Sequence, residues 1–140
     1  MTPSYPELDL QGIDLVLVRG AQGSGKSTFA RHLVDTHGFL LLEPDEFYHA
    51  GPHYFWDRAW LAIAHQWNRW RTLKALEAGL KVVVAETFYE ARFLHPYVAM
   101  TPHHAVYQMT GRFENVHNVP AETVERVRAS MEAYPGEIIL

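Results

Sequence analysis

The sequence predicts an α/β fold in which a small parallel β-sheet is covered by helices on both faces, giving three layers. Short, fully apolar segments, typical of strands buried on both faces, alternate along the chain with longer segments of helical periodicity. Glycine and proline separate the two kinds of segment. The 140 residues, 48% of them hydrophobic, suffice for a real core. We therefore expect a single domain over residues 1–140.

The expected strands are apolar runs bounded by turn residues, and they span residues 13–18, 39–43, 81–86 and 105–110, with a short edge strand at 137–140. The expected helices repeat apolar residues three and four positions apart. They cover residues 26–37, 57–79 and 121–134, with a short helix through residues 93–94. Gly38 is expected to end the first helix. The remaining segments are an irregular leader over residues 1–12 and loops over residues 44–56 and 111–120.

The long helix begins at Asp57, whose side chain suits the N-cap position. One apolar stripe along this helix is expected to pack in the core rather than to stack on bases. The stripe consists of Trp60, Ile63, Trp67 and Trp70. Three basic residues at helical spacing lie on another face, where they meet either an acceptor phosphate or water. They are Arg58, His65 and Arg69.

Composition excludes several classes of protein. The formal net charge is −4 and no basic block occurs, which argues against non-specific coating of nucleic acid. The chain has no cysteine, so disulfides, a thiolate nucleophile and thiolate-bound zinc are excluded. No apolar run is long enough to cross a bilayer, and the first residues do not resemble a secretory signal. We expect a cytoplasmic protein without a membrane partner.

The segment from Gly20 to Ser27 matches the pattern G-x-x-x-x-G-K-[ST], and it lies between an apolar strand and an amphipathic helix. Its glycines let successive N–H groups point inward and form an anion nest, to which the helix adds its positive end. Lys26 would reach the β- and γ-phosphates of a nucleotide, and the Ser27 hydroxyl would bind Mg²⁺. The predicted cofactors are therefore ATP and Mg²⁺. The predicted nucleotide-binding residues are Gly20, Gln22, Gly23, Ser24, Gly25, Lys26, Ser27 and Thr28.

Phosphoryl transfer also requires carboxylates, and ligands of α/β proteins lie at the carboxyl ends of the strands. Asp45 follows the second expected strand and is predicted to be the general base, with Glu43 and Glu46 as neighbours that could replace it. Glu86 ends the third expected strand and is predicted to be the carboxylate of the Mg²⁺ site.

A cation over the transferred phosphoryl group is expected from the lid loop, residues 111–120. Arg112 in this loop is the predicted residue. Arg126 and Arg128 on the last helix compete with it, but a solvated helix face explains them at least as well.

On these residues the chain resembles the kinase branch of the P-loop NTPases, and within it the 5′-polynucleotide kinase domain of the bacteriophage type and its short ATP-binding relatives. The resemblance covers about residues 15–134 and implies that Asp45, in "PDEFY", deprotonates a 5′-hydroxyl. "AHQWN" (64–68) resembles a motif of the long helix in these relatives. "AETF" stands where the family has "DTN", so that Glu86 replaces the aspartate and Phe88 the asparagine. "ENVHNVPAETVERV", residues 114–127, resembles the family's lid and final helix.

Two arginines of the family pattern are replaced in this sequence. Tyr48 stands where the family commonly has an arginine that holds the phosphate of the acceptor, and Glu114 stands where a lid arginine is expected. The sequence therefore predicts an ATP-dependent kinase whose acceptor is, on the resemblance, a nucleic-acid 5′-hydroxyl. The alternatives are a kinase of a nucleoside, sugar or other metabolite, which the acidic charge and the two replacements favour, and a non-catalytic nucleotide-binding switch. The oligomeric state is left open.

Overall fold

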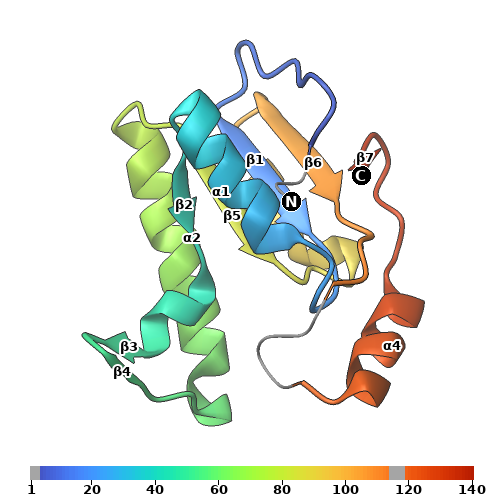
Figure 1. Cartoon of the computed structure of the whole chain (residues 1–140). Coiled ribbons are helices and arrows are strands. Elements are labelled where there is room, and N and C mark those ends of the chain that lie inside the picture. The colour runs from blue at the N-terminus through green and yellow to red at the C-terminus, as the bar shows by residue number, and fades with distance from the viewer. Residues whose placement is uncertain (1–3, 114–118) are drawn as a thin grey trace.

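The computed structural model describes residues 4–113 and 119–140, and its centre is a five-stranded sheet in the order β2-β5-β1-β6-β7 (Figure 1). Every neighbouring pair in this sheet is parallel. The strands are β1 (Leu15–Arg19), β2 (Leu40–Leu42), β5 (Val82–Glu86), β6 (His104–Gln108) and β7 (Ile138–Ile139). The prediction of an α/β fold with a small parallel sheet is confirmed.

Helices cover both faces of this sheet because its central strands are apolar on both sides. From β1, Val16 and Val18 pack on one face against α1 (Lys26–His37), while Leu15 and Leu17 belong to the core on the other face. The second face is covered by α2 (Leu61–Glu77) and α3 (His95–Val98). The short turn η3 (Ala91–Phe93) leads into α3. The helix α4 (Ala121–Ser130) precedes β7 (Figure 1). None of the helices in the described residues is long and apolar enough to span a membrane.

The segment expected to be an irregular loop, residues 44–56, contains regular structure. A 3₁₀ helix, η1 (Pro44–Tyr48), leads into an antiparallel hairpin of β3 (His49–Ala50) and β4 (His53–Tyr54). The hairpin turns at Gly51, which has a φ of +59° that suits glycine. In Figure 1 this hairpin and α4 lie on opposite sides of the carboxyl ends of the strands.

The expectation that the tryptophan stripe packs in the core is wrong. Trp60 is 49% exposed and Trp70 is 59% exposed. The face of α2 that packs on the protein instead consists of Ala64, Asn68 and Thr72, all of which are fully buried. Small and hydrogen-bonded side chains let the helix approach its neighbours closely, as when the Thr72 hydroxyl donates to the Asn68 carbonyl oxygen at 2.7 Å.

The prediction that Asp57 is a capping residue agrees with the structure. The Asp57 carboxylate accepts a hydrogen bond from the Ala59 backbone N–H at 2.9 Å, and so caps the short turn η2 (Arg58–Trp60) that leads into α2.

Arg19, the last residue of β1, is fully buried and holds three segments together. Its guanidinium donates to the Phe88 carbonyl oxygen at 3.0 Å and to the Glu132 carbonyl oxygen at 2.7 Å. It also forms an ion pair with Glu137 at 3.1 Å, whose side chain is buried as well. Arg19 therefore ties the end of β5 and the segment between α4 and β7 to the strand that precedes the phosphate loop.

We expect Arg19→Met to lower the free energy of unfolding by about 3–5 kcal/mol, because the change leaves the Glu137 carboxylate buried without its partner. Urea denaturation would measure the loss. Arg112→Met is the matched control, since the Arg112–Glu125 pair is exposed and is expected to contribute about 0–1 kcal/mol. Equal losses in the two variants would contradict this account of Arg19.

Candidate active site

The loop from Gly20 to Ser27 joins β1 to α1, and its conformation depends on glycine. Gly23 and Gly25 have φ values of +76° and +98°, in the left-handed region. A Cβ on Gly20 would lie 2.4 Å from the Ser24 Oγ and 2.7 Å from the Met109 carbonyl oxygen, so no side chain fits there. The loop is also fixed at its start, where the Gly20 N–H donates to the Thr87 carbonyl oxygen at 3.2 Å.

This loop presents hydrogen-bond donors that have no protein acceptor. Within residues 4–113 and 119–140, no acceptor is found for the backbone N–H groups of Gln22, Gly23, Gly25 and Lys26. The buried Ser24 hydroxyl likewise lacks a partner in this part of the chain. A set of converging donors at the start of a helix fits an anion such as a phosphate group.

Lys26, the first residue of α1, brings a positive charge to this loop. Its ammonium group donates to the Ala21 carbonyl oxygen at 3.3 Å. Burial lowers the pKa of Lys26 to about 8; the negative charge of Glu43 acts in the opposite direction, and the positive charge of Arg128 adds to the lowering. An anion bound in the loop would therefore gain a partly desolvated cation as its partner.

Three carboxylates lie in or beside η1, at the carboxyl end of β2, and they have different partners. Asp45 accepts a hydrogen bond from the Tyr54 hydroxyl at 2.6 Å, and its other oxygen lies 3.6 Å from the His49 Nε2. Glu46 is occupied, because it pairs with Arg71 at 2.8 Å and accepts the Glu43 N–H at 2.8 Å. Of the sequence-predicted candidates for a general base, Glu46 is the one whose carboxylate forms an ion pair with an arginine among the described residues.

Glu43 interacts electrostatically both with Lys26 of the phosphate loop and with Asp45. Burial is the main cause that raises the pKa of the Glu43 carboxyl, and the charges of Glu46 and Asp45 raise it further. The positive charges of Arg31 and Lys26 act in the opposite direction. Among the described residues, Asp45 and Glu43 form no ion pair with an arginine or lysine, so these two carboxylates stay the candidates at this strand end.

Glu86 ends β5, the strand between β2 and β1, and is paired in register with Arg19, directly before the phosphate loop. One of its oxygens accepts from the Tyr97 hydroxyl at 3.2 Å, and the other lies 3.5 Å from the His65 Nδ1. The carboxylate is mostly buried and lies where sequence analysis predicted it, at the same edge of the sheet as η1.

A hydrogen-bond network across α2 connects the two strand ends. Asn68, fully buried, donates to the Tyr97 hydroxyl oxygen at 3.1 Å and accepts from the Arg71 Nε at 2.8 Å. Arg71 in turn donates to the Glu43 carbonyl oxygen at 2.8 Å. The chain of contacts therefore runs from Glu86 to the residue that precedes η1. Sequence analysis did not single out this network; its signal was two uncharged polar residues, Asn68 and Thr72, four positions apart on one helix.

The segment that follows β6 crosses the phosphate loop. The Gly111 N–H donates to the Ser24 carbonyl oxygen at 3.1 Å, and the Phe113 N–H donates to the Gly23 carbonyl oxygen at 2.7 Å. The start of the predicted lid, residues 111–120, therefore contacts the loop directly. Residues 114–118 of this lid, including Glu114, Asn115 and His117, lie outside the described residues.

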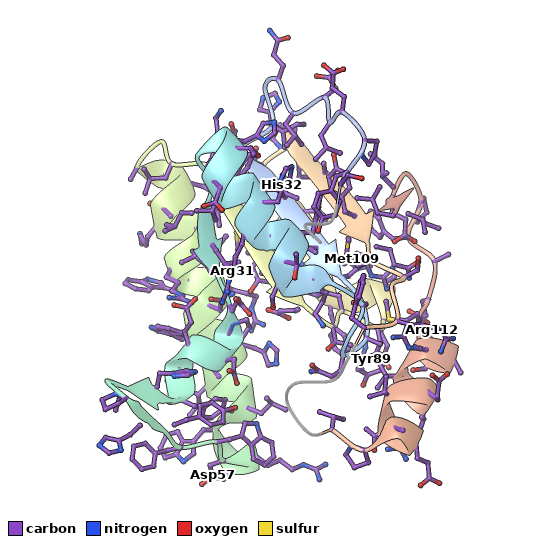
Figure 2. All side chains as sticks on the ribbon, viewed as in Figure 1. Arg31, His32, Asp57, Tyr89, Met109 and Arg112 are labelled. Carbon is purple, nitrogen blue, oxygen red and sulfur yellow. The ribbon has the colours of Figure 1, made fainter. Side chains whose placement is uncertain are left out.

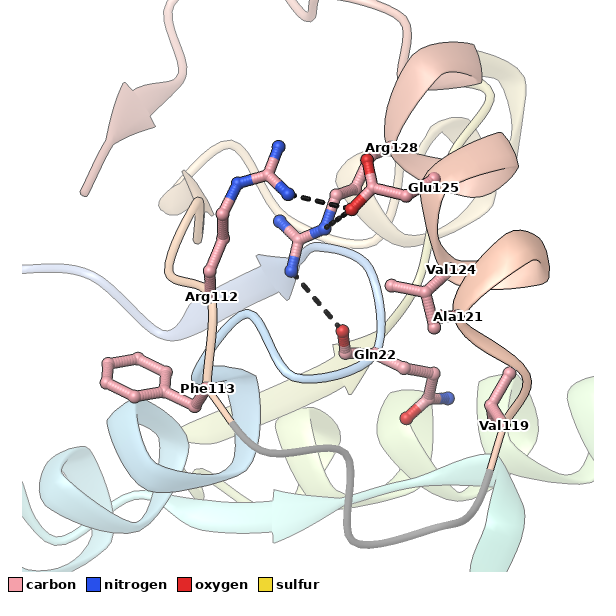
Figure 3. A pocket seen from close by; sticks show the side chains of 8 residues that line it. All are labelled: Gln22, Arg112, Phe113, Val119, Ala121, Val124, Glu125 and Arg128. Carbon is pink, nitrogen blue, oxygen red and sulfur yellow. Dashed lines mark hydrogen bonds and ion pairs between the residues drawn. The ribbon is translucent and has the colours of Figure 1, made fainter.

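The two arginines near this segment differ in what they contact (Figure 3). Arg112 pairs with Glu125 of α4 at 2.7 Å, and its side chain is 69% exposed. Arg128 is only 15% exposed; it donates to the Gly111 carbonyl oxygen at 2.9 Å and lies 3.5 Å from the Gln22 carbonyl oxygen. The interpretation of Arg128 as part of a solvated helix face is therefore wrong, whereas Arg126 is exposed as expected.

Two cavities adjoin the phosphate loop. One, of about 220 Å³, lies between the loop and α4, and its polar lining includes Gln22, Arg112 and Arg128 (Figure 3). The other, of about 310 Å³, is mostly apolar and lies beside Gly25 and Thr28, under the leader segment. Its other lining residues are Ser4, Tyr5, Pro6, Ser24, Met109, Gly111, Phe113 and Leu140.

The sequence is similar to known proteins over most of its length. A family model described as an AAA domain matches residues 15–134. Among curated proteins, the chain is similar to NEDD4-binding protein 2 of Homo sapiens, with 36% identity over 95 residues. That match covers 66% of this chain and 5% of the human protein, so the chain spans a small fraction of that relative's length.

The fold is similar to those of solved kinases. A sugar kinase from Janibacter sp. HTCC2649 has a TM-score of 0.62 and 19% identity, covering 91% of this chain and 83% of that one. A chain of the Pnkp1/Rnl/Hen1 complex has a TM-score of 0.60 and 18% identity, covering 89% of this chain and 44% of that one. At such identities the likeness shows a P-loop kinase-like fold and no specific activity.

Proposed function

This chain belongs to the AAA domain family, and from that premise we propose that it is an ATP-dependent kinase that transfers the γ-phosphate to a hydroxyl group. The observation that carries the proposal is the loop from Gly20 to Ser27, where four backbone N–H groups lack acceptors among the described residues and a partly buried lysine lies beside them. A site that only bound an anion would need neither a base nor a metal ligand. Here the carboxylates at the ends of the neighbouring strands β2 and β5 are candidates for both roles.

In this proposal the nucleotide-binding residues have separate tasks. The backbone N–H groups and Lys26 hold the phosphates, and Ser27 and Glu86 would hold Mg²⁺. Residues 4–113 and 119–140 contain no cluster of three metal-binding side chains, which fits an ion that proteins bind through one or two side chains together with the phosphates of the substrate. When bound, Mg²⁺ neutralises charge on the phosphate oxygens. Asp45 accepts the proton of the attacking hydroxyl, and Arg112 or Arg128 faces the transferred group.

The apolar cavity of about 310 Å³ is proposed to receive the nucleoside part of ATP. It adjoins Gly25 and Thr28, on the helix that begins at the phosphates, and Tyr5 and Phe113 provide aromatic rings for a base. The triphosphate would then run from this cavity along the loop toward the carboxylates at the strand ends.

The proposed acceptor is the 5′-hydroxyl of a nucleic acid. Two facts support it: the resemblance of the "PDEFY" and "AHQWN" segments to the bacteriophage-type kinase domain, and the similarity in fold to a chain of a complex described as an RNA repair complex. A small-molecule acceptor is the second candidate, which the net charge of −4 and the similarity in fold to a sugar kinase favour.

A panel of acceptors tests this assignment. Release of ADP from Mg²⁺–ATP would be measured with a single-stranded oligonucleotide bearing a 5′-hydroxyl, the same strand bearing a 5′-phosphate, a nucleoside, and sugars such as gluconate. We expect stimulation by the 5′-hydroxyl strand alone. Stimulation by a sugar or nucleoside and not by the strand would transfer the assignment to the small-molecule candidate.

The lowered pKa of Lys26 predicts a pH dependence of nucleotide affinity. The free protein loses the Lys26 proton near pH 8, whereas bound phosphates favour the charged form, so binding takes up a proton above that pH. We expect the dissociation constant of ATP, measured by calorimetry, to rise about tenfold from pH 7 to pH 9.

Lys26→Arg is the control for this prediction, because arginine stays charged throughout the range and should give a flat profile. The unfolded chain holds the Lys26 proton more tightly than the folded protein does. The free energy of unfolding should therefore rise between pH 8 and 10.5, while the affinity for ATP falls. A flat affinity profile for the wild-type protein would contradict the role of the Lys26 charge.

A further inference from the structure

We propose that two aromatic side chains at the end of the β3–β4 hairpin form a stacking platform for the terminal nucleobase of a single-stranded acceptor. This inference rests on the proposed function, because it takes the acceptor to be a nucleic acid. The hairpin platform, as we call it, consists of Tyr54 and Trp56, whose rings both contact the ring of Tyr48.

The rings of the hairpin platform are open to solvent. Trp56 is 55% exposed and Tyr54 is 50% exposed, and Phe55 and Trp60, near them in the sequence, are exposed as well. Aromatic side chains of this size are usually buried, and a patch of them on a surface marks a site that binds something. Base–aromatic stacking contributes about 1–3 kcal/mol per base and accepts any base, since every base has an aromatic face.

The platform is held in place from below by Tyr48, which is buried in η1. The Tyr48 ring contacts the rings of Tyr54 and Trp56, with centroids 6.3 and 6.5 Å apart. The backbone N–H of Phe55 donates to the Tyr48 carbonyl oxygen at 2.9 Å. The platform and η1 therefore form one unit, and a base that stacks on these rings does not have to order them first.

The platform is joined directly to the proposed general base. The Tyr54 hydroxyl donates to the Asp45 carboxylate at 2.6 Å, and burial together with this contact raises the pKa of Tyr54 to about 12, so it remains a donor at neutral pH. A ligand stacked on the Tyr54 ring would thus lie beside Asp45. Because the platform adjoins the proposed base, its ligand is inferred to be the acceptor. An unrelated protein partner would have no need to bind beside that base.

One cation near the platform suits a phosphodiester chain. Arg58 lies at the start of α2, and its guanidinium makes no hydrogen bond or ion pair with any described residue. The nearby carboxylate of Asp57, labelled at the lower end of the molecule in Figure 2, accepts a hydrogen bond from a backbone N–H. A strand that stacks its first base on the rings would find the Arg58 cation for its phosphates here.

The test compares Trp56→Ala with Trp70→Ala, a control tryptophan on α2 that is equally exposed and lies outside the platform. Each protein would phosphorylate two oligonucleotides that differ at the first nucleotide, one with a base and one abasic. We expect Trp56→Ala to raise the KM of the intact strand about 5- to 100-fold, with the KM of ATP unchanged. The wild-type protein and Trp70→Ala should prefer the intact strand by a similar factor, and Trp56→Ala should lose that preference.

Two other results would overturn the inference. One is a Trp56→Ala variant with the same KM as Trp70→Ala; the other is a wild-type protein that treats the abasic and intact strands alike, which would leave the rings to a protein partner. Failure of the proposed function is a separate result, in which the wild-type protein phosphorylates neither strand. Quenching of tryptophan fluorescence by the two strands, measured without ATP, then decides the inference: equal or absent binding overturns it, and preferential binding of the intact strand supports it.

Discussion

Lys26→Met is expected to weaken ATP binding by about 2–5 kcal/mol, which corresponds to roughly 30- to 5,000-fold in the dissociation constant. The ammonium group is partly buried beside a loop in which four backbone N–H groups have no acceptor among residues 4–113 and 119–140, so its charge is the strongest single attraction that the loop offers to a phosphate. Methionine keeps the length of the side chain and removes the charge. Calorimetric titration with Mg²⁺–ATP would measure the loss.

The same change should leave the free protein folded and slightly more stable, because burial already disfavours the charge of Lys26. Thermal unfolding without nucleotide would check this. Lys74→Met is the matched control: Lys74 is exposed and, in the part of the chain that the structure describes, pairs only with Glu77, so its replacement should change neither affinity nor stability measurably. An ATP affinity that survives Lys26→Met would mean that the nucleotide does not bind at this loop.

Asp45→Asn is expected to lower kcat about 10²- to 10⁴-fold while the affinity for ATP stays nearly unchanged. Asparagine keeps an oxygen that can accept the hydrogen bond of Tyr54, so the hairpin should remain in place, but the amide cannot take a proton. Single-turnover phosphorylation of the acceptor would measure the rate of the chemical step apart from substrate binding.

Glu43→Gln tests whether the general base is Glu43 rather than Asp45. Glu43 interacts electrostatically with Lys26, and its replacement is expected to alter ATP affinity more than kcat. If Glu43→Gln lowered kcat 10²-fold or more and Asp45→Asn did not, the base would be Glu43 and the assignment of Asp45 would be wrong.

The fold and the position of the loop could be predicted from sequence because both depend on local patterns. Apolar runs between turn residues mark strands buried on two faces, and the spacing from Gly20 to Lys26 fixes a loop between a strand and a helix. The roles predicted for Lys26, Asp45, Arg112 and Glu86 stay predictions.

Which face of a helix is covered depends on neighbours that are distant in sequence, and here prediction failed. The stripe from Trp60 to Trp70 has the periodicity of a core face, yet α2 packs through Ala64 and Asn68 because the buried Tyr97 hydroxyl supplies a partner for the amide. Arg128 was misjudged for a similar reason. In the sequence Arg128 lies on a helix rich in charged residues, whereas the carbonyl oxygen that holds it belongs to Gly111, in the segment after β6.

The central claim is that the chain moves the γ-phosphate of ATP to an acceptor hydroxyl. The most direct measurement is the fate of γ-labelled ATP after incubation with Mg²⁺, the wild-type protein and a 5′-hydroxyl oligonucleotide. The account predicts label on the 5′ end in amounts equal to the ADP formed, and none with Lys26→Met. Tight binding of ATP with no ADP and no labelled strand, also in the presence of sugars and nucleosides, would contradict it and identify the protein as a nucleotide-binding switch.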